Sequence, residues 1–139
     1  MNAVDTNILL YSIDRHEPAK QAKAQQLLRQ LLSGPPPTVL LWQVLAELVQ
    51  QLRRWKDQRR LTEAEFDAHV QVFRHSFPLA LPTVATLDNA LDLARRFSLS
   101  HWDSMVLGAC REIQVTRLYT EDMGAPRTID TIQLVNPLI

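Results

Sequence analysis

The sequence predicts an α/β protein, a three-layer α/β/α sandwich around a mostly parallel sheet of about four to five strands. Short apolar runs alternate with longer amphipathic segments along the chain, as in folds whose strands are joined by helices. The clearest run, residues 38–41, is continuously apolar after its first residue and follows three prolines, which is typical of a strand covered on both faces. The length of 139 residues suits one domain, which we assign to residues 1–139.

The first half of the chain contains two strands and three helices. A short apolar strand at residues 3–4 leads into a helix. Apolar residues recur every three or four positions from Pro18 to Leu32, which predicts an amphipathic helix, and residues 33–37, Ser-Gly-Pro-Pro-Pro, end it. The strand at residues 38–41 is followed by a helix from about Trp42 to Lys56.

The second half repeats this alternation. Thr62 and Glu65 have the spacing of a capping box, so a helix begins next to them. The remaining elements are a short strand within 77–82, helices over 87–97 and 102–113, and strands at 117–119 and 132–135. Trp102 falls on the apolar stripe of the last helix, so we expect its indole in the core.

Charge and cysteine content limit the classes of partner. Fifteen Lys and Arg balance fifteen Asp and Glu, so no overall basic field attracts nucleic acid or an anionic membrane, and such a partner needs a local patch. Cys110 is the one cysteine and has no internal disulfide partner, and the first residues lack the pattern of a signal peptide. No apolar run approaches the roughly 18 residues that cross a bilayer. We therefore expect a cytoplasmic protein without membrane insertion.

Acidic residues stand where the predicted parallel strands end. Asp5 closes the first strand, Asp122 follows the strand at 117–119, and Asp103 opens the helix before that strand. Ligands of open parallel sheets bind at the carboxyl ends of the strands, so these three carboxylates can share one site. Glu47, in the helix after the second strand, is the fourth candidate.

Each acid also has an ordinary structural explanation. Asp5 can cap the helix that follows it, and Asp103 completes Ser100-His101-Trp102-Asp103, which has the spacing of a capping box. Glu47 lies off the apolar stripe of its helix, where a solvated glutamate is common. Asp122 can belong to a polar turn. Local sequence alone leaves both interpretations open.

Together these segments resemble a known family. The motif D-T-N-x-L-x-Y at residues 5–11, Glu47 in Leu-Ala-Glu-Leu, the run 100–106 with Ala109, and residues 118–122 resemble the PIN domain, more narrowly the VapC-type toxin nucleases of toxin-antitoxin pairs. The resemblance extends over nearly the whole chain. It implies four acidic site residues with two polar supporters: Asp5, Glu47, Asp103 and Asp122, with Asn7 and Thr120. It selects Asp122 rather than the adjacent Glu121.

Four neighbouring carboxylates repel one another unless a cation lies between them. All-oxygen ligands favour Mg²⁺ or Mn²⁺, and such ions support phosphodiester hydrolysis. We expect Asp5 to be a direct ligand, Asp103 and Asp122 direct or water-mediated ligands, and Glu47 a ligand or a positioner of the attacking water. The resemblance implies an RNA substrate, a homodimer and a small antitoxin protein that silences the nuclease.

An RNA substrate requires a surface that binds phosphates. Five cations within eight residues form what we call the basic segment: Arg53, Arg54, Lys56, Arg59 and Arg60. They also suit a solvated helix end whose cations complement the helix dipole. His101 and Trp102, beside Asp103, can touch a base, but the place of Trp102 on the apolar stripe of its helix favours the core.

Two other functions stay open. A haloacid-dehalogenase-like phosphatase also places an aspartate after its first strand, but it needs a second aspartate two residues later, where this chain has Asn7. A non-catalytic PIN-like binding module would keep the fold without the metal.

Overall fold

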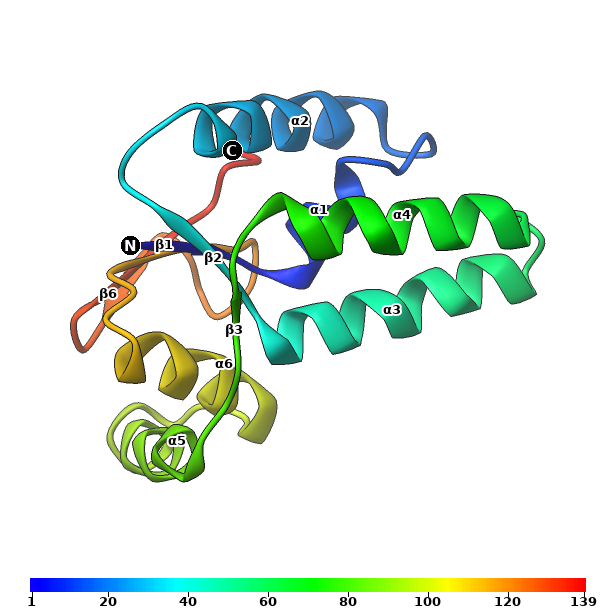
Figure 1. The fold of residues 1–139 in the computed structure, drawn as a ribbon. Helices are drawn as coiled ribbons and strands as arrows, with labels where there is room; N and C mark the ends of the chain where they lie inside the picture. Colours follow the sequence, from blue (N-terminus) through cyan, green and yellow to red (C-terminus); the bar gives the residue numbers. More distant parts are fainter.

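The computed structural model describes residues 1–139 as a central sheet with helices on both sides. Helix α2 (Pro18–Leu32) lies on one side of the sheet, and α5 (Val84–Phe97) and α6 (His101–Glu112) lie on the other (Figure 1). The predicted three-layer α/β/α architecture is therefore confirmed.

The sheet has six strands in the order β3-β2-β1-β4-β6-β5. Their bounds are β1 Asn2–Val4, β2 Thr38–Leu41, β3 Leu79–Ala80, β4 Arg117–Tyr119, β5 Arg127–Ile129 and β6 Ile132–Val135. All neighbouring strands are parallel except β5 and β6. The expected count of about four to five was too low because β5 has no apolar run: Arg127 and Thr128 are exposed, and only Ile129 is buried.

The remaining three helices follow strands β1 and β2 in the chain. Helix α1 (Thr6–Tyr11) follows β1 directly, and α3 (Trp42–Asp57) and α4 (Glu63–Ser76) form an antiparallel hairpin that extends away from the sheet (Figure 1). The predicted capping box starts α4: the Glu65 N–H donates to Thr62 Oγ1 at 3.1 Å, and the Thr62 N–H donates to Glu65 Oε1 at 3.0 Å. No helix has the length and apolar character needed to cross a membrane.

The register of β1 and β4 determines which side chains meet at the edge of the sheet. Val4 is opposite Tyr119, so the next residues, Asp5 and Thr120, emerge side by side at the carboxyl ends of the two strands. Strand β1 lies between β2 and β4, which makes this edge the point where the strand order reverses. Ligands of open α/β sheets bind at such a point.

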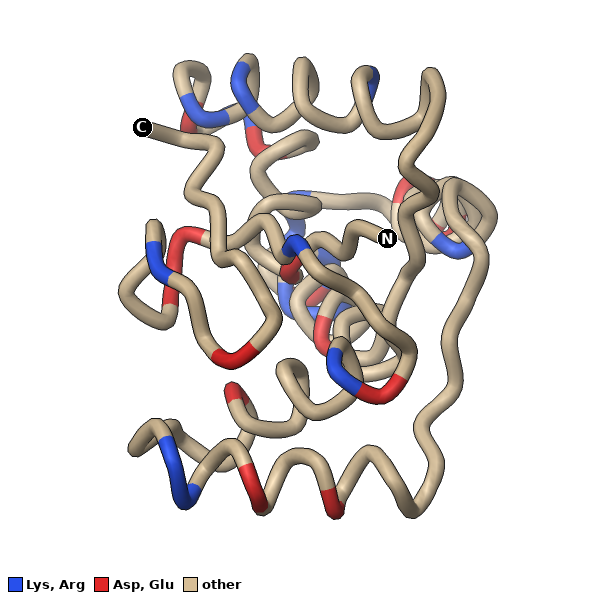
Figure 2. Tube along the Cα trace, turned by 90° about the vertical axis from the view of Figure 1, so that its left-hand side faces the viewer, with Lys and Arg blue, Asp and Glu red and all other residues tan.

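Charged residues are scattered over the fold, and α3, α4, α5 and α6 each carry both signs (Figure 2). The neutral total therefore arises from mixing rather than from two opposed charged halves.

Candidate active site

All four acids predicted from the sequence line one small pocket of about 100 Å³ at the carboxyl ends of β1 and β4: Asp5, Glu47, Asp103 and Asp122. They come from four different segments, the end of β1, the second turn of α3, the first turn of α6 and the loop after β4. We call this space the carboxylate pocket.

Asp5 is the most buried of the four, with 8% of its surface exposed. Its Oδ1 accepts the Thr6 N–H at 2.8 Å, so it does cap α1, and its Oδ2 accepts the Thr120 hydroxyl at 2.8 Å. Capping and a place in the pocket are compatible, because each carboxylate oxygen accepts one of these bonds and keeps a further lone pair.

Asp122 is held by the polar supporters that the sequence predicted. Its N–H donates to Thr120 Oγ1 at 3.0 Å, and the Asn7 amide donates to its Oδ2 at 3.5 Å. Glu121 turns away from the pocket: its carboxylate accepts the Tyr11 hydroxyl at 2.7 Å. The structure thus separates the two adjacent acids into a pocket residue and a residue that ties the loop to α1.

Glu47 is half-buried rather than freely solvated. Its Oε2 accepts the Thr6 hydroxyl at 3.0 Å, and its Oε1 accepts the Gln43 amide at 2.9 Å. Thr6 and Gln43 are the polar pocket residues that the sequence analysis missed. Gln43 and Glu47 lie one helical turn apart, and this spacing is a sequence signal from which their contact could have been predicted.

Asp103 begins α6 in the way its local sequence suggests. Its N–H donates to Ser100 Oγ at 3.3 Å, which caps the helix. The reciprocal bond from the Ser100 N–H to the Asp103 carboxylate is not formed, so this carboxylate faces the pocket instead.

The pocket stabilises protonated carboxyl groups. The pKa of Asp5 is raised to about 6: burial is the largest cause, hydrogen bonds from Thr120 and Thr6 oppose it, and the charges of Asp122 and Glu47 add to it. The pKa of Asp122 is also raised, by burial and by the charges of Glu121 and Asp103. The carboxylates therefore repel one another across the pocket.

The donor set suits a hard cation. All four candidate ligands are carboxylates, and hydroxyl and amide groups surround them, as Mg²⁺ and Mn²⁺ prefer. In this arrangement no three His, Cys, Asp or Glu side chains converge closely enough to hold one metal ion together. The acids share a pocket without forming a closed set of ligands.

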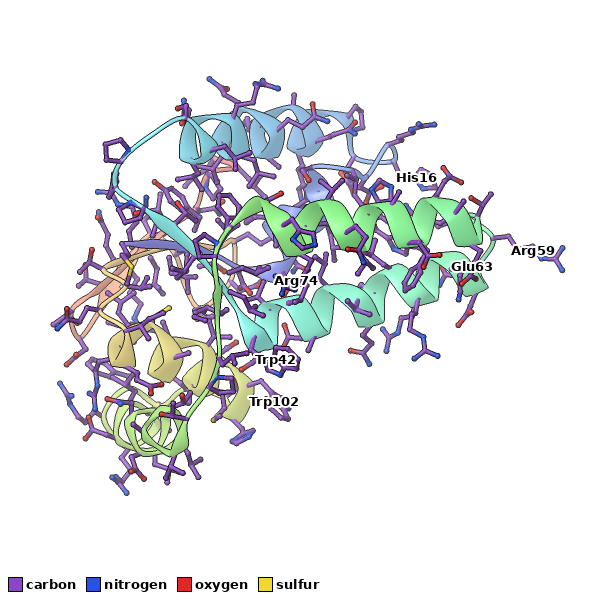
Figure 3. The ribbon with its side chains drawn as sticks, viewed as in Figure 1. His16, Trp42, Arg59, Glu63, Arg74 and Trp102 are labelled. Carbon is purple, nitrogen blue, oxygen red and sulfur yellow. The ribbon has the colours of Figure 1, made fainter.

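Trp102 contradicts its sequence-based assignment to the core. Its side chain is 63% exposed and lines the mouth of the carboxylate pocket, beside Trp42 at the start of α3 (Figure 3). The buried residues of α6 begin at Ser104, so Trp102 lies in the exposed first turn, before the buried part of the helix.

The basic segment lies away from the pocket. None of its five residues lines the carboxylate pocket, and Arg59 is at the tip of the α3–α4 hairpin, at the opposite end of α3 from Trp42 (Figure 3). Lys56 pairs with Glu63 at 3.1 Å, and Arg60 pairs with Asp14 at 3.1 Å. The other three cations are exposed: Arg53, Arg54 and Arg59.

Comparison with known families gives one match: residues 3–129 match the PIN domain. No curated protein matches the chain significantly.

Solved structures with a similar fold cover almost the whole chain. A toxin-antitoxin complex from Klebsiella pneumoniae has a TM-score of 0.69 and 18% identity, covering 99% of this chain and 98% of that one. VapBC2 from Rickettsia felis, bound to a DNA fragment from its promoter, has a TM-score of 0.69 and 15% identity, covering 96% of both chains. VapC20 from Mycobacterium tuberculosis, a toxin that cleaves the sarcin-ricin loop, has a TM-score of 0.68 and 17% identity, covering 96% of this chain and 99% of that one.

Proposed function

Because this chain belongs to the PIN domain family, we propose that it is a metal-dependent endoribonuclease and the toxin of a toxin-antitoxin pair. The observation that carries the proposal is the convergence of Asp5, Glu47, Asp103 and Asp122 on one pocket at the carboxyl edge of β1 and β4. The proposed nuclease is the single domain 1–139 and acts on RNA in the cytoplasm.

Each acid has a proposed role. Asp5, Asp103 and Asp122 hold a Mg²⁺ or Mn²⁺ ion, directly or through water, and Glu47 is a further ligand or orients the attacking water. When bound, the ion supplies Lewis-acid catalysis: it stabilises charge on the phosphate and makes water more acidic. Thr120 and Asn7 hold Asp5 and Asp122 in place, and Thr6 and Gln43 hold Glu47. The four carboxylates repel one another, and a bound cation would relieve this repulsion.

The test is cleavage of a panel of RNAs with Mn²⁺ and with excess EDTA. We expect cleavage with Mn²⁺ only, and its loss in Asp5→Asn and Asp103→Asn. Asp67→Asn, an exposed acid on α4, is the matched control and should cleave like the wild type. Full activity of Asp5→Asn would contradict the site assignment. Hydrolysis of a phosphatase substrate without RNA cleavage would favour a haloacid-dehalogenase-like phosphatase. The absence of both activities would favour a non-catalytic binding module.

The structural neighbours support a protein partner, because two of them are toxin-antitoxin complexes. The surface offers a fitting feature, a groove of about 230 Å³ between α1, α2 and α4 in which Leu32 and Val72 are 57% and 64% exposed. We propose that an antitoxin segment buries apolar residues there and places an Arg or Lys among the pocket carboxylates.

A basic side chain in the pocket neutralises the same charges as a metal ion, so the two should compete. Inhibition by a peptide with an amphipathic stretch and one basic residue should therefore weaken as the Mn²⁺ concentration rises. Inhibition independent of Mn²⁺ would mean that the partner blocks RNA without entering the pocket.

We also propose that the chain forms a homodimer. Light scattering on the purified protein tests this, and a monomer at tens of micromolar would reject it.

The basic segment is proposed to bind RNA phosphates outside the pocket. Its exposed members Arg53 and Arg54 lie on α3, two turns beyond Glu47. Replacing both with Ala should reduce the slope of log affinity against log salt by about 0.7 for each lost phosphate contact with single-stranded RNA. An unchanged slope would assign these cations to solvent.

A further inference from the structure

An open groove adjoins the carboxylate pocket along α3. It has a volume of about 560 Å³, and Asn7, Gln43 and Trp102 line both the pocket and the groove. Gln50 and Gln51 line the part further along α3. Anything that binds in this groove therefore touches whatever is held at the carboxylates.

The groove is rich in amides and has no cation. Four of its lining residues carry side-chain amides, and none is Lys or Arg, while Glu47 adds a carboxylate. A phosphate has no attractive charge here. An amide offers both a donor and an acceptor, which is what the edge of an unpaired nucleobase presents.

Trp102 forms one wall of this groove. Trp102 is 63% exposed, although burial is the favourable state of such a large apolar side chain. The Gln43 amide donates to the Trp102 carbonyl oxygen at 3.1 Å, and the His101 ring packs edge-on against the indole at 4.6 Å. The Gln43 bond thus anchors the main chain at Trp102 and the His101 ring supports the indole, while much of the residue stays open to solvent, as a stacking surface requires.

We propose that this groove binds the base of an unpaired nucleotide next to the scissile phosphate, with Trp102 stacking on the base and the amides of Gln50 and Gln51 contacting its edge. The proposal rests on the ribonuclease function proposed above. It selects RNA with accessible bases, such as a loop or a single strand, because in a duplex the base faces are stacked and the edges paired.

Binding without cleavage tests the subsite. We would measure the affinity of a labelled single-stranded RNA and of the same sequence in a blunt duplex, at low salt in excess EDTA, by fluorescence anisotropy. Trp102→Ala should weaken single-strand binding about 5- to 150-fold, the value of one stacked base. Trp102→Phe should restore most of it, and duplex binding should change little.

The matched control is Trp42→Ala. Trp42 is also exposed, at 48%, and lies beside Trp102, but it lines neither the groove nor the carboxylate pocket. It should leave the affinity for RNA unchanged. Gln50→Ala should weaken binding of some base sequences more than others, which a lost apolar contact would not do.

Three outcomes would overturn the proposal: wild-type protein that does not bind single-stranded RNA, unchanged affinity in Trp102→Ala, and an equal loss for single strand and duplex. A change in oligomeric state with unchanged RNA affinity would assign the ring to a protein interface instead. Cleavage assays separate this proposal from the function on which it rests. Base-dependent binding through Trp102 without cleavage would support the subsite and reject the nuclease function. Normal cleavage with unchanged RNA affinity in Trp102→Ala would support the nuclease function and reject the subsite.

Discussion

Replacing Asp5 with Asn should stabilise the fold at neutral pH. The pKa of Asp5 rises from 3.8 to about 6 on folding, chiefly because the carboxylate is buried. At about 1.4 kcal/mol per pH unit, this difference means that the ionised carboxylate costs about 3 kcal/mol of folding free energy above pH 6.

The sign follows from proton binding. Between about pH 4 and pH 6 the unfolded chain has released the Asp5 proton while the folded chain retains it, so wild-type stability falls as the pH rises through this window. An Asn does not titrate and avoids this loss. Its amide nitrogen, however, takes the place of the oxygen that accepts the Thr120 hydroxyl, which costs about 1 kcal/mol.

We therefore expect Asp5→Asn to be about 2 kcal/mol more stable than the wild type at pH 7 and about 1 kcal/mol less stable at pH 4. Urea unfolding in EDTA at both pH values measures the two differences. Asp67→Asn, exposed on α4, should show no comparable reversal between the two pH values. A variant that loses as much stability at pH 7 as at pH 4 would refute the argument that the burial of its charge dominates the energetics of Asp5.

Three further outcomes follow from the same structure. Mn²⁺ should stabilise the wild type against urea, by about 2.7 kcal/mol at one hundred times its dissociation constant, and should stabilise Asp5→Asn much less; equal stabilisation would place the ion elsewhere. Gly108→Ala should lower stability by about 1–3 kcal/mol, because its Cβ would lie 2.7 Å from the Ala90 backbone nitrogen, whereas Gly34→Ala, with open space around it, serves as the control. Thr62→Ala removes the capping box of α4 and should cost about 1 kcal/mol in the same unfolding assay.

Local patterns were sufficient for most of the elements. The predicted bounds of α2, β2, β4 and β6 match the structure, because periodicity, prolines and apolar runs are properties of neighbouring residues. The start of α4 was predictable for the same reason, since a capping box lies within four consecutive residues. The four acids were found from their positions at strand and helix ends together with the family resemblance.

Contacts between distant segments were not predictable in this way. β5 gains its place by pairing with β6 rather than from its own composition, and Trp102 is exposed in the first turn of α6, before the buried part of that helix begins at Ser104. Glu47 is fixed by Thr6, 41 positions earlier, and Asp5 by Thr120, 115 positions later.

The sequence by itself determined the α/β class, the bounds of α2, β2, β4 and β6, and the identity of the acids. Only the tertiary structure decided that these acids share one pocket, that Glu121 turns away from it and that an indole and four amides adjoin it. The physical reason is that helix and strand preferences act over a few residues, whereas the pocket depends on the order and register of strands from opposite ends of the chain.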